Sequence, residues 1–551
     1  MNISSTSSFD HNKYQAFQAI GMQQRQWPNH RIEQAPRWCS EDLRDGNQAL
    51  INPLSIEQKM TFFKLLVRLG FKEIVVGFPS ASQTDFDFVR LLIERVVIPE
   101  DVTISVLTPA REAFIERSFA ALKGANQAIV HLYNSTSKTQ REKVFNMDKS
   151  AVISLAVNAA KTMNHCANKQ ADTEWCFEYT PESFTATEPE FAVEICNAVA
   201  DIWQPTAEYP VIFNLPSTVE NTTPNIYADR IEWFSTHINN RENIILSVHT
   251  HNDRGTAVAS AELALLAGAQ RVEGTLLGNG ERTGNADLLV MAMNLYSQGI
   301  DPKLDFSKME SVVETVSHLN QINLHPRHPY AGDLVFTAFS GSHQDAIKKC
   351  LRYQKSEEIW DVAYLPIDPV DIGRNYQEVV RINSQSGKGG VTYIVEQELG
   401  LQLPRWLQSE FSQVIQSLAE ETSQEISSVE LLELFQNKYL QATGNFQLLN
   451  FSIEHEQQDR LHACIKTPTD EISIKGTGEG AITAFVDGLK KHFARKIEIV
   501  HYDEHALTTG TESEAVCYIQ LNYNGVLKTG VACHKDIVSA SLNAVLKGIS
   551  V

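Results

Sequence analysis

The sequence predicts an α/β fold: a (β/α)8 TIM barrel, then a helical linker, then an α+β domain of two β-β-β-α units. Eight short apolar runs rich in β-branched residues alternate with helical segments over about 250 residues, as in a closed barrel. From about residue 305 the pattern is mostly helical, and from about 445 three strands and a helix follow one another twice. A doubly wound open sheet is the alternative, which we disfavour because no GxGxxG follows the first strand.

The predicted barrel strands are 37–43, 73–78, 103–107, 128–133, 174–179, 210–215, 244–250 and 271–276. The first helix shows how the intervening segments are recognised. Ser55 to Gln58 form a capping box, and Gly70 is suited to end the helix. Between them an apolar face is expected from the helical spacing of Met60, Phe63, Leu66 and Val67.

The later strands are predicted at 446–454, 460–466, 470–475, 496–502, 515–522 and 525–532, with helices near 479–493 and 535–548. The chain therefore divides into four predicted parts. These are an N-terminal arm (1–35), the barrel (36–305), helical linker subdomains (306–435) and a C-terminal domain (436–551). A duplicated module of this kind suggests a surface for a small ligand or a dimer between its halves.

Composition excludes several classes of protein. A formal net charge of −20 argues against binding to nucleic acid or to an anionic membrane, although a few local cations still allow an anionic small substrate. No apolar run approaches the roughly 20 residues of a membrane span, and the N-terminus has no signal-peptide core. The eight cysteines form no close CxxC pair. We therefore expect a cytoplasmic protein with reduced thiols.

Three motifs lie where predicted strands end, which is where a barrel carries its chemistry. HTHND begins at His249, and the alternation of a strand places His249 and His251 on one face. SEDLRDGNQ contributes Arg44 and Asp45, and GNGERTGNAD contributes Asn285 beside Glu281 and Arg282. Each motif alone fits a structural role equally well: hydrogen-bonded histidines, a loop ion pair or a glycine-rich turn.

Together the motifs predict a metal site. The first, seventh and eighth strands are neighbours in a closed barrel, which brings Asp45, His249, His251 and Asn285 together. Two nitrogen and two oxygen ligands, with room for substrate oxygens, suit Zn²⁺, Mn²⁺ or Mg²⁺. Arg44 can stabilise negative charge on a carbonyl oxygen. Further candidates at the mouth, each more often structural, are His131, Tyr133, Thr180, Glu182, Asn214, Pro216 and Thr218.

These motifs resemble those of the enzymes that condense an acyl-CoA with a 2-oxoacid. The wider set, RWCSEDLRDGNQAL, NLPSTVE, FSGSHQDAI, YLPIDPVDIGR and NSQSGKGG, is similar to the 2-isopropylmalate synthases of the longer bacterial type. The resemblance implies that Asp45, His249, His251 and Asn285 hold the metal and that Arg44 stabilises the enolate or oxyanion. It places His131, Thr180, Asn214, Pro216 and Thr218 around the oxoacid.

The resemblance also extends beyond the barrel. In this family the helical subdomain lends residues to the partner subunit's site, and His343 and Tyr376 match them by motif. The C-terminal domain is similar to the family's leucine-sensing domain, with Tyr502 and Ala506 in its YDEHA motif. Thr529 departs from the pattern, because relatives often read WGVG where this chain has TGVA. A homodimer and inhibition by leucine are implied.

The expected reaction is a metal-dependent Claisen condensation of acetyl-CoA with 2-oxoisovalerate (3-methyl-2-oxobutanoate), followed by thioester hydrolysis to 2-isopropylmalate and CoA. This is the first committed step of leucine biosynthesis. His343 and Glu182 are the competing candidates for proton transfer. The alternatives are a homocitrate or citramalate synthase, a metal-dependent lyase on the same barrel, and a non-catalytic amino-acid sensor.

Overall fold

The computed structural model describes residues 11–17, 19–22, 24–376, 388–422, 426, 428–440, 446–455, 457–507 and 513–550. Contacts divide the chain into two units, Met1–Val335 and Phe336–Val551. The four-part division predicted from the sequence stays a prediction. No helix in the described residues is long and apolar enough to cross a membrane.

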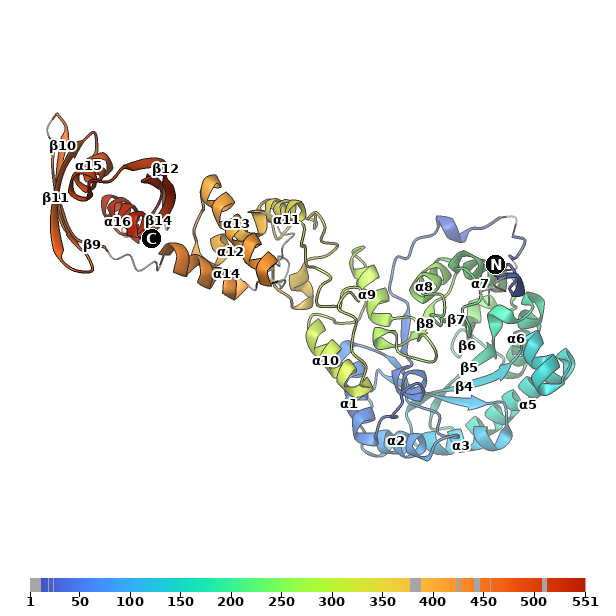
Figure 1. Ribbon diagram of the computed structural model, residues 1–551. Helices are drawn as coiled ribbons and strands as arrows, with labels where there is room; N and C mark the ends of the chain where they lie inside the picture. The colour runs from blue at the N-terminus through green and yellow to red at the C-terminus, as the bar shows by residue number, and fades with distance from the viewer. Residues whose placement is uncertain are drawn as a thin grey trace, which may run out of the picture. The chain divides into compact units, whose positions relative to one another are not determined.

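The first unit contains the predicted barrel, closed in the order β1 to β8 with every neighbouring pair parallel. Figure 1 labels its strands β4 to β8. Closure is seen at Cys39, which pairs in register with Glu73 of β2 and with Glu273 of β8. The strands are β1 (Arg37–Ser40), β2 (Glu73–Val75), β3 (Thr103–Pro109), β4 (Gln127–Ser135), β5 (Glu174–Glu182), β6 (Val211–Asn214), β7 (Ile244–His249) and β8 (Arg271–Gly274).

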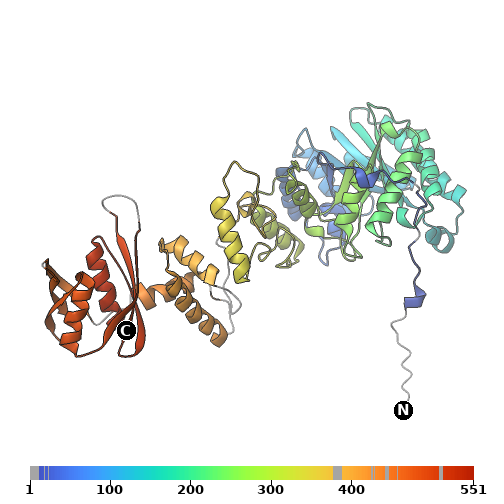
Figure 2. The same ribbon diagram turned by 90° about the horizontal axis from the view of Figure 1, so that it is seen from above.

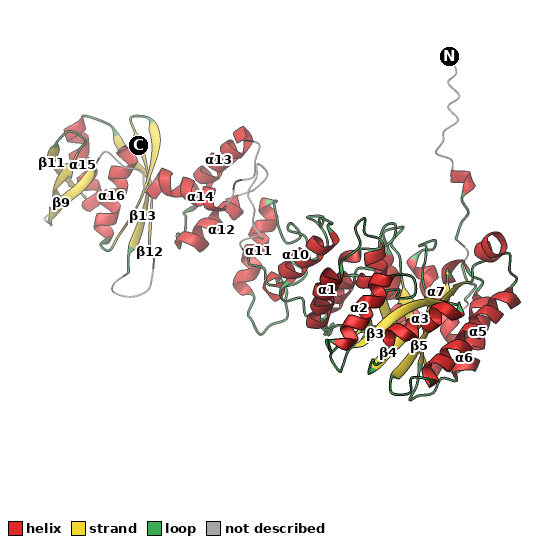
Figure 3. Cartoon of the chain, turned by 90° about the horizontal axis from the view of Figure 1, so that it is seen from below, coloured by secondary structure: helices red, strands yellow, loops and turns green. Residues whose placement is uncertain are grey.

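Helices surround these strands, as the view from below shows (Figure 3). They are α1 (Ile56–Leu69), α2 (Gln83–Glu94), α3 (Glu112–Leu122), α4 (Lys138–Gln140), α5 (Lys149–Asn168), α6 (Pro189–Trp203), α7 (Pro224–His237), α8 (Ala257–Leu266), α9 (Leu288–Tyr296) and α10 (Met309–Asn320). The capping box of Ser55 and Gln58 is present, and Gly70 ends α1 at φ 106°.

The helix predicted from the spacing of Met60, Phe63, Leu66 and Val67 is present as α1. Met60 and Val67 are only half-buried, whereas Phe63 and Leu66 are buried as expected. The buried face also includes Lys59, whose ammonium has acceptors in the turn after β1 and in the first turn of α2.

The second unit begins with helices and ends with two sheets. The helices, yellow to orange in Figure 2, are α11 (Gly341–Tyr353), α12 (Lys388–Leu399), α13 (Arg405–Thr422) and α14 (Ser428–Phe435). The predicted tandem module is confirmed as β9 (Gln447–Glu454), β10 (Asp459–Lys466), β11 (Glu471–Gly478), α15 (Ala481–Phe493), β12 (Ile497–Ala506), β13 (Ala515–Tyr523), β14 (Val526–His534) and α16 (Ile537–Ser550).

Each half of the module is an antiparallel three-stranded sheet with one helix, and the two helices share a core with both sheets. The opposite face of the second sheet is also covered. There Val516, Tyr518 and Val531 pack against Leu407 and Phe411 of α13 in a second apolar cluster. The linker helices and the C-terminal sheet are thus joined through a buried core.

Candidate active site

A cavity of about 330 Å³ opens at the C-terminal ends of the barrel strands. It is where a (β/α)8 barrel carries its reactive groups. Of the barrel residues predicted for the site, all except Asn285 line it: Arg44, Asp45, His131, Thr180, Glu182, Asn214, Pro216, Thr218, His249 and His251. Asn285 lies next to it and donates from Nδ2 to Oδ2 of Asp45 at 2.6 Å.

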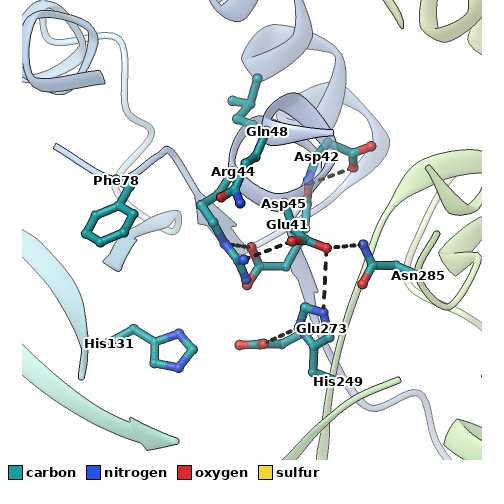
Figure 4. A network of polar contacts seen from close by, with 12 residues as sticks. Glu41, Asp42, Arg44, Asp45, Gln48, Phe78, His131, His249, Glu273 and Asn285 are labelled. Atoms are coloured by element: carbon teal, nitrogen blue, oxygen red, sulfur yellow. Dashed lines mark hydrogen bonds and ion pairs between the residues drawn. The ribbon is translucent and has the colours of Figure 1, made fainter. Parts of the chain in front are cut away.

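Asp45, His249 and His251 form a buried group whose ligand atoms lie within 4.8 Å of one another. Figure 4 shows Asp45 and His249 of this group together with Asn285. Oδ2 of Asp45 is 3.9 Å from Nε2 of His249 and 3.9 Å from Nε2 of His251. His249 is the last residue of β7, and Asp45 lies in the π-helical turn Asp42–Gly46 that follows β1. The two motifs are adjacent because β1 closes the barrel beside β8.

Two features fit this group to a divalent cation. Nδ1 of His249 lies 2.9 Å from Oε2 of Glu273, which fixes the ring so that Nε2 faces Asp45, the usual support of a metal-binding histidine. Oδ1 of Asn285 is buried and has no hydrogen-bond partner among the described residues. Burial would raise the pKa of Asp45, but Arg44 and the two histidines lower it to about 2, so the carboxylate is charged.

Arg44 is held beside this group by two carboxylates. Nε donates to Oε2 of Glu41 at 2.8 Å and Nη1 to Oδ1 of Asp45 at 3.1 Å (Figure 4). Burial alone would lower the pKa of Arg44, but these carboxylates raise it above its ordinary value. A permanent, oriented cation therefore lines the cavity next to the candidate metal ligands.

The opposite side of the cavity is built from β4, β5 and β6. Nε2 of His131 lies 2.6 Å from Oγ1 of Thr180. Burial lowers the pKa of His131 to about 3, so the ring is neutral. Nδ2 of Asn214 donates to Oε2 of Glu273 at 2.9 Å, and Oγ1 of Thr218 accepts from the Ser183 amide at 2.9 Å. Phe78, Leu107 and Tyr133 add apolar surface.

Glu182 lines the cavity at the end of β5 and accepts from Oγ of Ser135 at 2.5 Å. Its position in the sequence also allows Glu182 to pair with Arg44 or with the metal shell. The carboxylates that bind Arg44 are instead Glu41 and Asp45. Glu182 therefore faces the cavity while it accepts a hydrogen bond from the Ser135 hydroxyl.

A buried charge network lies beneath the cavity, and the sequence motifs did not predict it. Arg271 is fully buried, with Nη1 2.7 Å from Glu273 and 3.1 Å from Glu178, and Nε 2.5 Å from Glu73. Glu273 therefore joins this network to His249. Glu and Arg residues inside the predicted strands could have indicated this network, since charged residues are rarely buried without partners.

The rim of the cavity is closed by side chains of the GNGERTGN loop. Arg282 donates to Asp253 at 2.6 Å and to the carbonyl oxygen of Thr218 at 2.6 Å. Gln48 donates to Glu281 at 3.1 Å. The loops after β1, β6, β7 and β8 are thus linked around the opening.

The remaining predicted residues lie in the second unit. In α11 the His343 ring stacks on Tyr364 at 3.9 Å between centroids, and the Tyr376 hydroxyl donates to Asp368 at 2.9 Å. The Tyr502 hydroxyl contacts Glu504 and Ser541, and Ala506 ends β12. Of the SGKGG part of the NSQSGKGG motif, residues 386–387 lie outside the described residues and 388–390 begin α12.

Three family models and many relatives match nearly the whole chain. Residues 35–316 match the HMGL-like family, 333–396 the alpha-isopropylmalate synthase post-catalytic domain-like family, and 425–551 the LeuA allosteric (dimerisation) domain. The chain is 53% identical over 540 residues to a 2-isopropylmalate synthase of Pseudomonas savastanoi, covering 98% of this chain and 96% of the relative. It is 51% identical over 545 residues to that of Alcanivorax borkumensis, covering 98% and 97%.

Among solved structures, an HMG-CoA lyase of Bacillus subtilis is similar with a TM-score of 0.43 at 20% identity, covering 53% of this chain and 96% of the lyase.

Proposed function

The chain belongs to the 2-isopropylmalate synthase family, and we propose that it condenses acetyl-CoA with 2-oxoisovalerate and hydrolyses the thioester to 2-isopropylmalate and CoA. The observation that carries this proposal is the buried Asp45–His249–His251 group beside Arg44, in a chain that matches such synthases over nearly its full length. The reaction is the first committed step of leucine biosynthesis.

Asp45, His249, His251 and Asn285 are the residues proposed to hold the divalent cation. When bound, the cation supplies Lewis-acid polarisation of the C2 carbonyl of the oxoacid. Arg44 stabilises the negative charge that develops on the oxygen during attack by the acetyl carbanion, because its cation is already oriented by Glu41 and Asp45. Mg²⁺, Mn²⁺ and Zn²⁺ all suit this donor set.

His131, Thr180, Asn214, Pro216 and Thr218 are proposed to surround the oxoacid. The neutral His131 and the Thr180 hydroxyl offer hydrogen bonds without adding charge. The apolar groups Phe78 and Leu107 favour a branched hydrocarbon tail over the second carboxylate of 2-oxoglutarate, since burying an unpaired charge is costly. Pyruvate would leave part of the same surface without a contact.

Proton abstraction from the acetyl methyl is assigned to one of two groups. Glu182 lines the cavity, and His343 belongs to α11 of the second unit, with Tyr376 nearby in sequence. The match of residues 333–396 to the alpha-isopropylmalate synthase post-catalytic domain-like family supports His343 and Tyr376 as residues lent to a partner subunit's site. His343→Ala would then collapse turnover without lowering metal content, whereas unaffected turnover would leave Glu182 as the base.

A homodimer inhibited by leucine completes the proposal. The match of residues 425–551 to the LeuA allosteric (dimerisation) domain supports it, with leucine contacting Tyr502 and Ala506. We place the protein in the cytoplasm, in keeping with eight cysteines that are all unpaired.

The test is release of free thiol from acetyl-CoA with 2-oxoisovalerate, pyruvate or 2-oxoglutarate, each with and without EDTA. EDTA-sensitive release that is strongest with 2-oxoisovalerate, and weaker after adding leucine, supports the proposal. A preference for pyruvate or 2-oxoglutarate would indicate a citramalate or homocitrate synthase. No release from metal-loaded protein would return the assignment to a lyase or an amino-acid sensor.

A further inference from the structure

Another buried ion pair lies behind the active-site loops, outside the group that holds the candidate metal ligands. Nζ of Lys59, on α1, is 2.5 Å from Oδ1 of Asp85, in the first turn of α2. The Lys59 side chain is 1% exposed and that of Asp85 11% exposed. Burying such a pair carries a desolvation cost, and an apolar pair would join the two helices without it. The role of the pair is therefore sought in its other contacts, which reach two active-site loops.

Lys59 reaches the turn that carries the proposed catalytic residues. Its Nζ also donates to the main-chain oxygen of Leu43 at 3.3 Å. Leu43 is fully buried and lies in the turn Asp42–Gly46, directly before Arg44 and Asp45. The ammonium thus fixes the peptide group immediately before Arg44.

Asp85 reaches the next loop of the barrel. Its second oxygen, Oδ2, accepts from the Phe78 amide at 2.8 Å. Gly77 has φ +140°, and a Cβ there would lie 2.7 Å from Cγ of Asp85, so the carboxylate packs directly on the backbone. The Phe78 ring lines the cavity on the same side as His131 (Figure 4).

We propose that Lys59 and Asp85 are positioning residues that hold the Arg44–Asp45 turn and the Phe78 loop in a fixed relation at the barrel mouth. This inference rests on the proposed function for the roles of Arg44, Asp45 and Phe78. One ion pair spans two loops: its cation binds the backbone beside the charged residues, and its anion binds the backbone of the apolar wall. Loss of either charge frees both loops, because each partner holds the other in place.

The first test measures Mn²⁺ affinity by calorimetry in Asp85→Asn and Lys59→Met. Among the described residues, the hydrogen bonds and ion pair of the Asp85 carboxylate go to Lys59 and to the Phe78 amide, so Asp85→Asn should reach the Arg44–Asp45 turn through Lys59. We expect Mn²⁺ to bind about tenfold more weakly in both variants, in the range found for residues that orient metal ligands. Unchanged affinity in both folded variants would overturn the proposal.

Arg241→Met is the matched control. Arg241 is a partly buried cation that donates to the main-chain oxygens of Ile244 and Gly268, at the opposite end of β7 and β8. Arg241→Met should lower the melting temperature while leaving Mn²⁺ affinity unchanged. If the three variants lose stability and Mn²⁺ affinity in the same proportion, the role of Lys59 and Asp85 is only structural.

Two further measurements separate the outcomes. Should Lys59→Met fail to fold, the double variant Lys59→Met with Asp85→Asn removes both charges, and hydrogen exchange of peptides covering 42–48 and 77–80 should rise together. In the assay, kcat/KM for 2-oxoisovalerate should fall about tenfold. If the parent protein releases no thiol, the proposed function fails, while Mn²⁺ affinity and hydrogen exchange still decide the role of the pair.

Discussion

Glu273 accepts a hydrogen bond from Nδ1 of His249 at 2.9 Å while its other oxygen binds the fully buried Arg271 at 2.7 Å. The carboxylate therefore ties a proposed metal ligand to a charge that cannot move. Glu273→Gln keeps the shape and weakens both contacts. We expect Mn²⁺ to bind about 10–100-fold more weakly, as found when the partner of a metal-binding histidine is changed. Calorimetric titration of apo protein measures this.

Glu73→Gln is the control for that prediction. Glu73 binds the same guanidinium, at 2.5 Å from Nε, and sits on β2 rather than beside His249. Glu73→Gln should lower the free energy of unfolding with little change in Mn²⁺ affinity. Equal losses of affinity in the two variants would show that the whole network matters and that the contact of Glu273 with His249 has no special role.

Arg44→Lys tests the oriented cation. Lysine keeps the charge but not the planar fork that binds Glu41 and Asp45 at once. We expect kcat to fall by about 10²–10³-fold, the range for loss of a group that stabilises an oxyanion. Mn²⁺ titration accompanies the assay. A kcat close to that of the parent, at saturating metal, would remove Arg44 from the charge-stabilising role.

Most of the barrel was predictable because each strand is a short β-branched run followed by a helical period. All eight predicted strands are present, and each begins at or within one residue of the observed start, as β4 does at Gln127. Strand ends were less certain. The first strand was predicted to residue 43 but ends at Ser40, because Asp42 accepts from Oγ of Ser40 and from the Leu276 amide and starts the turn.

The candidate site was predictable where its residues lie in motifs at strand ends. Asp45, His249 and His251 come together simply because the barrel closes. Glu273 and Lys59 were not predicted, and the reason is physical. The role of a buried charged residue in a strand or helix depends on its ion-pair partner. The partners here, Arg271 and Asp85, are brought close by packing between elements and cannot be identified from spacing along the chain.

Acid should destabilise the barrel through His131. Burial lowers its pKa to about 3, below the ordinary value of about 6.5, so between these pH values the unfolded chain binds a proton that the folded chain does not. Stability therefore falls as pH drops below about 6.5. From pH 7 to pH 5 this single group removes about 2 kcal/mol, which His131→Asn should abolish.

Urea unfolding of the metal-free protein at pH 7 and pH 5 measures this difference. The variant should lose about 2 kcal/mol less than the parent over that interval. Equal losses in the two proteins would mean that His131 already takes up its proton in the folded state near pH 6.

Thr529 should stabilise the junction between α13 and the second sheet. Glu410 accepts from Thr529 Oγ1 at 2.7 Å, from Gln520 Nε2 at 3.0 Å and from the Tyr439 hydroxyl at 3.0 Å. Thr529→Val removes one of these bonds at nearly constant volume. We expect a loss of about 1.5 kcal/mol, the lower end for a hydrogen bond to a charged group because Glu410 is half-buried.

A double-mutant cycle decides whether the hydrogen bond to Glu410 is the cause. In a Glu410→Ala background, Thr529→Val should have almost no further effect on thermal unfolding of the full chain, because the acceptor is gone. A full loss in that background would place the effect in packing of the methyl group. The same variants, titrated with leucine in the thiol assay, should shift the proposed half-inhibition by leucine only if this junction transmits the signal.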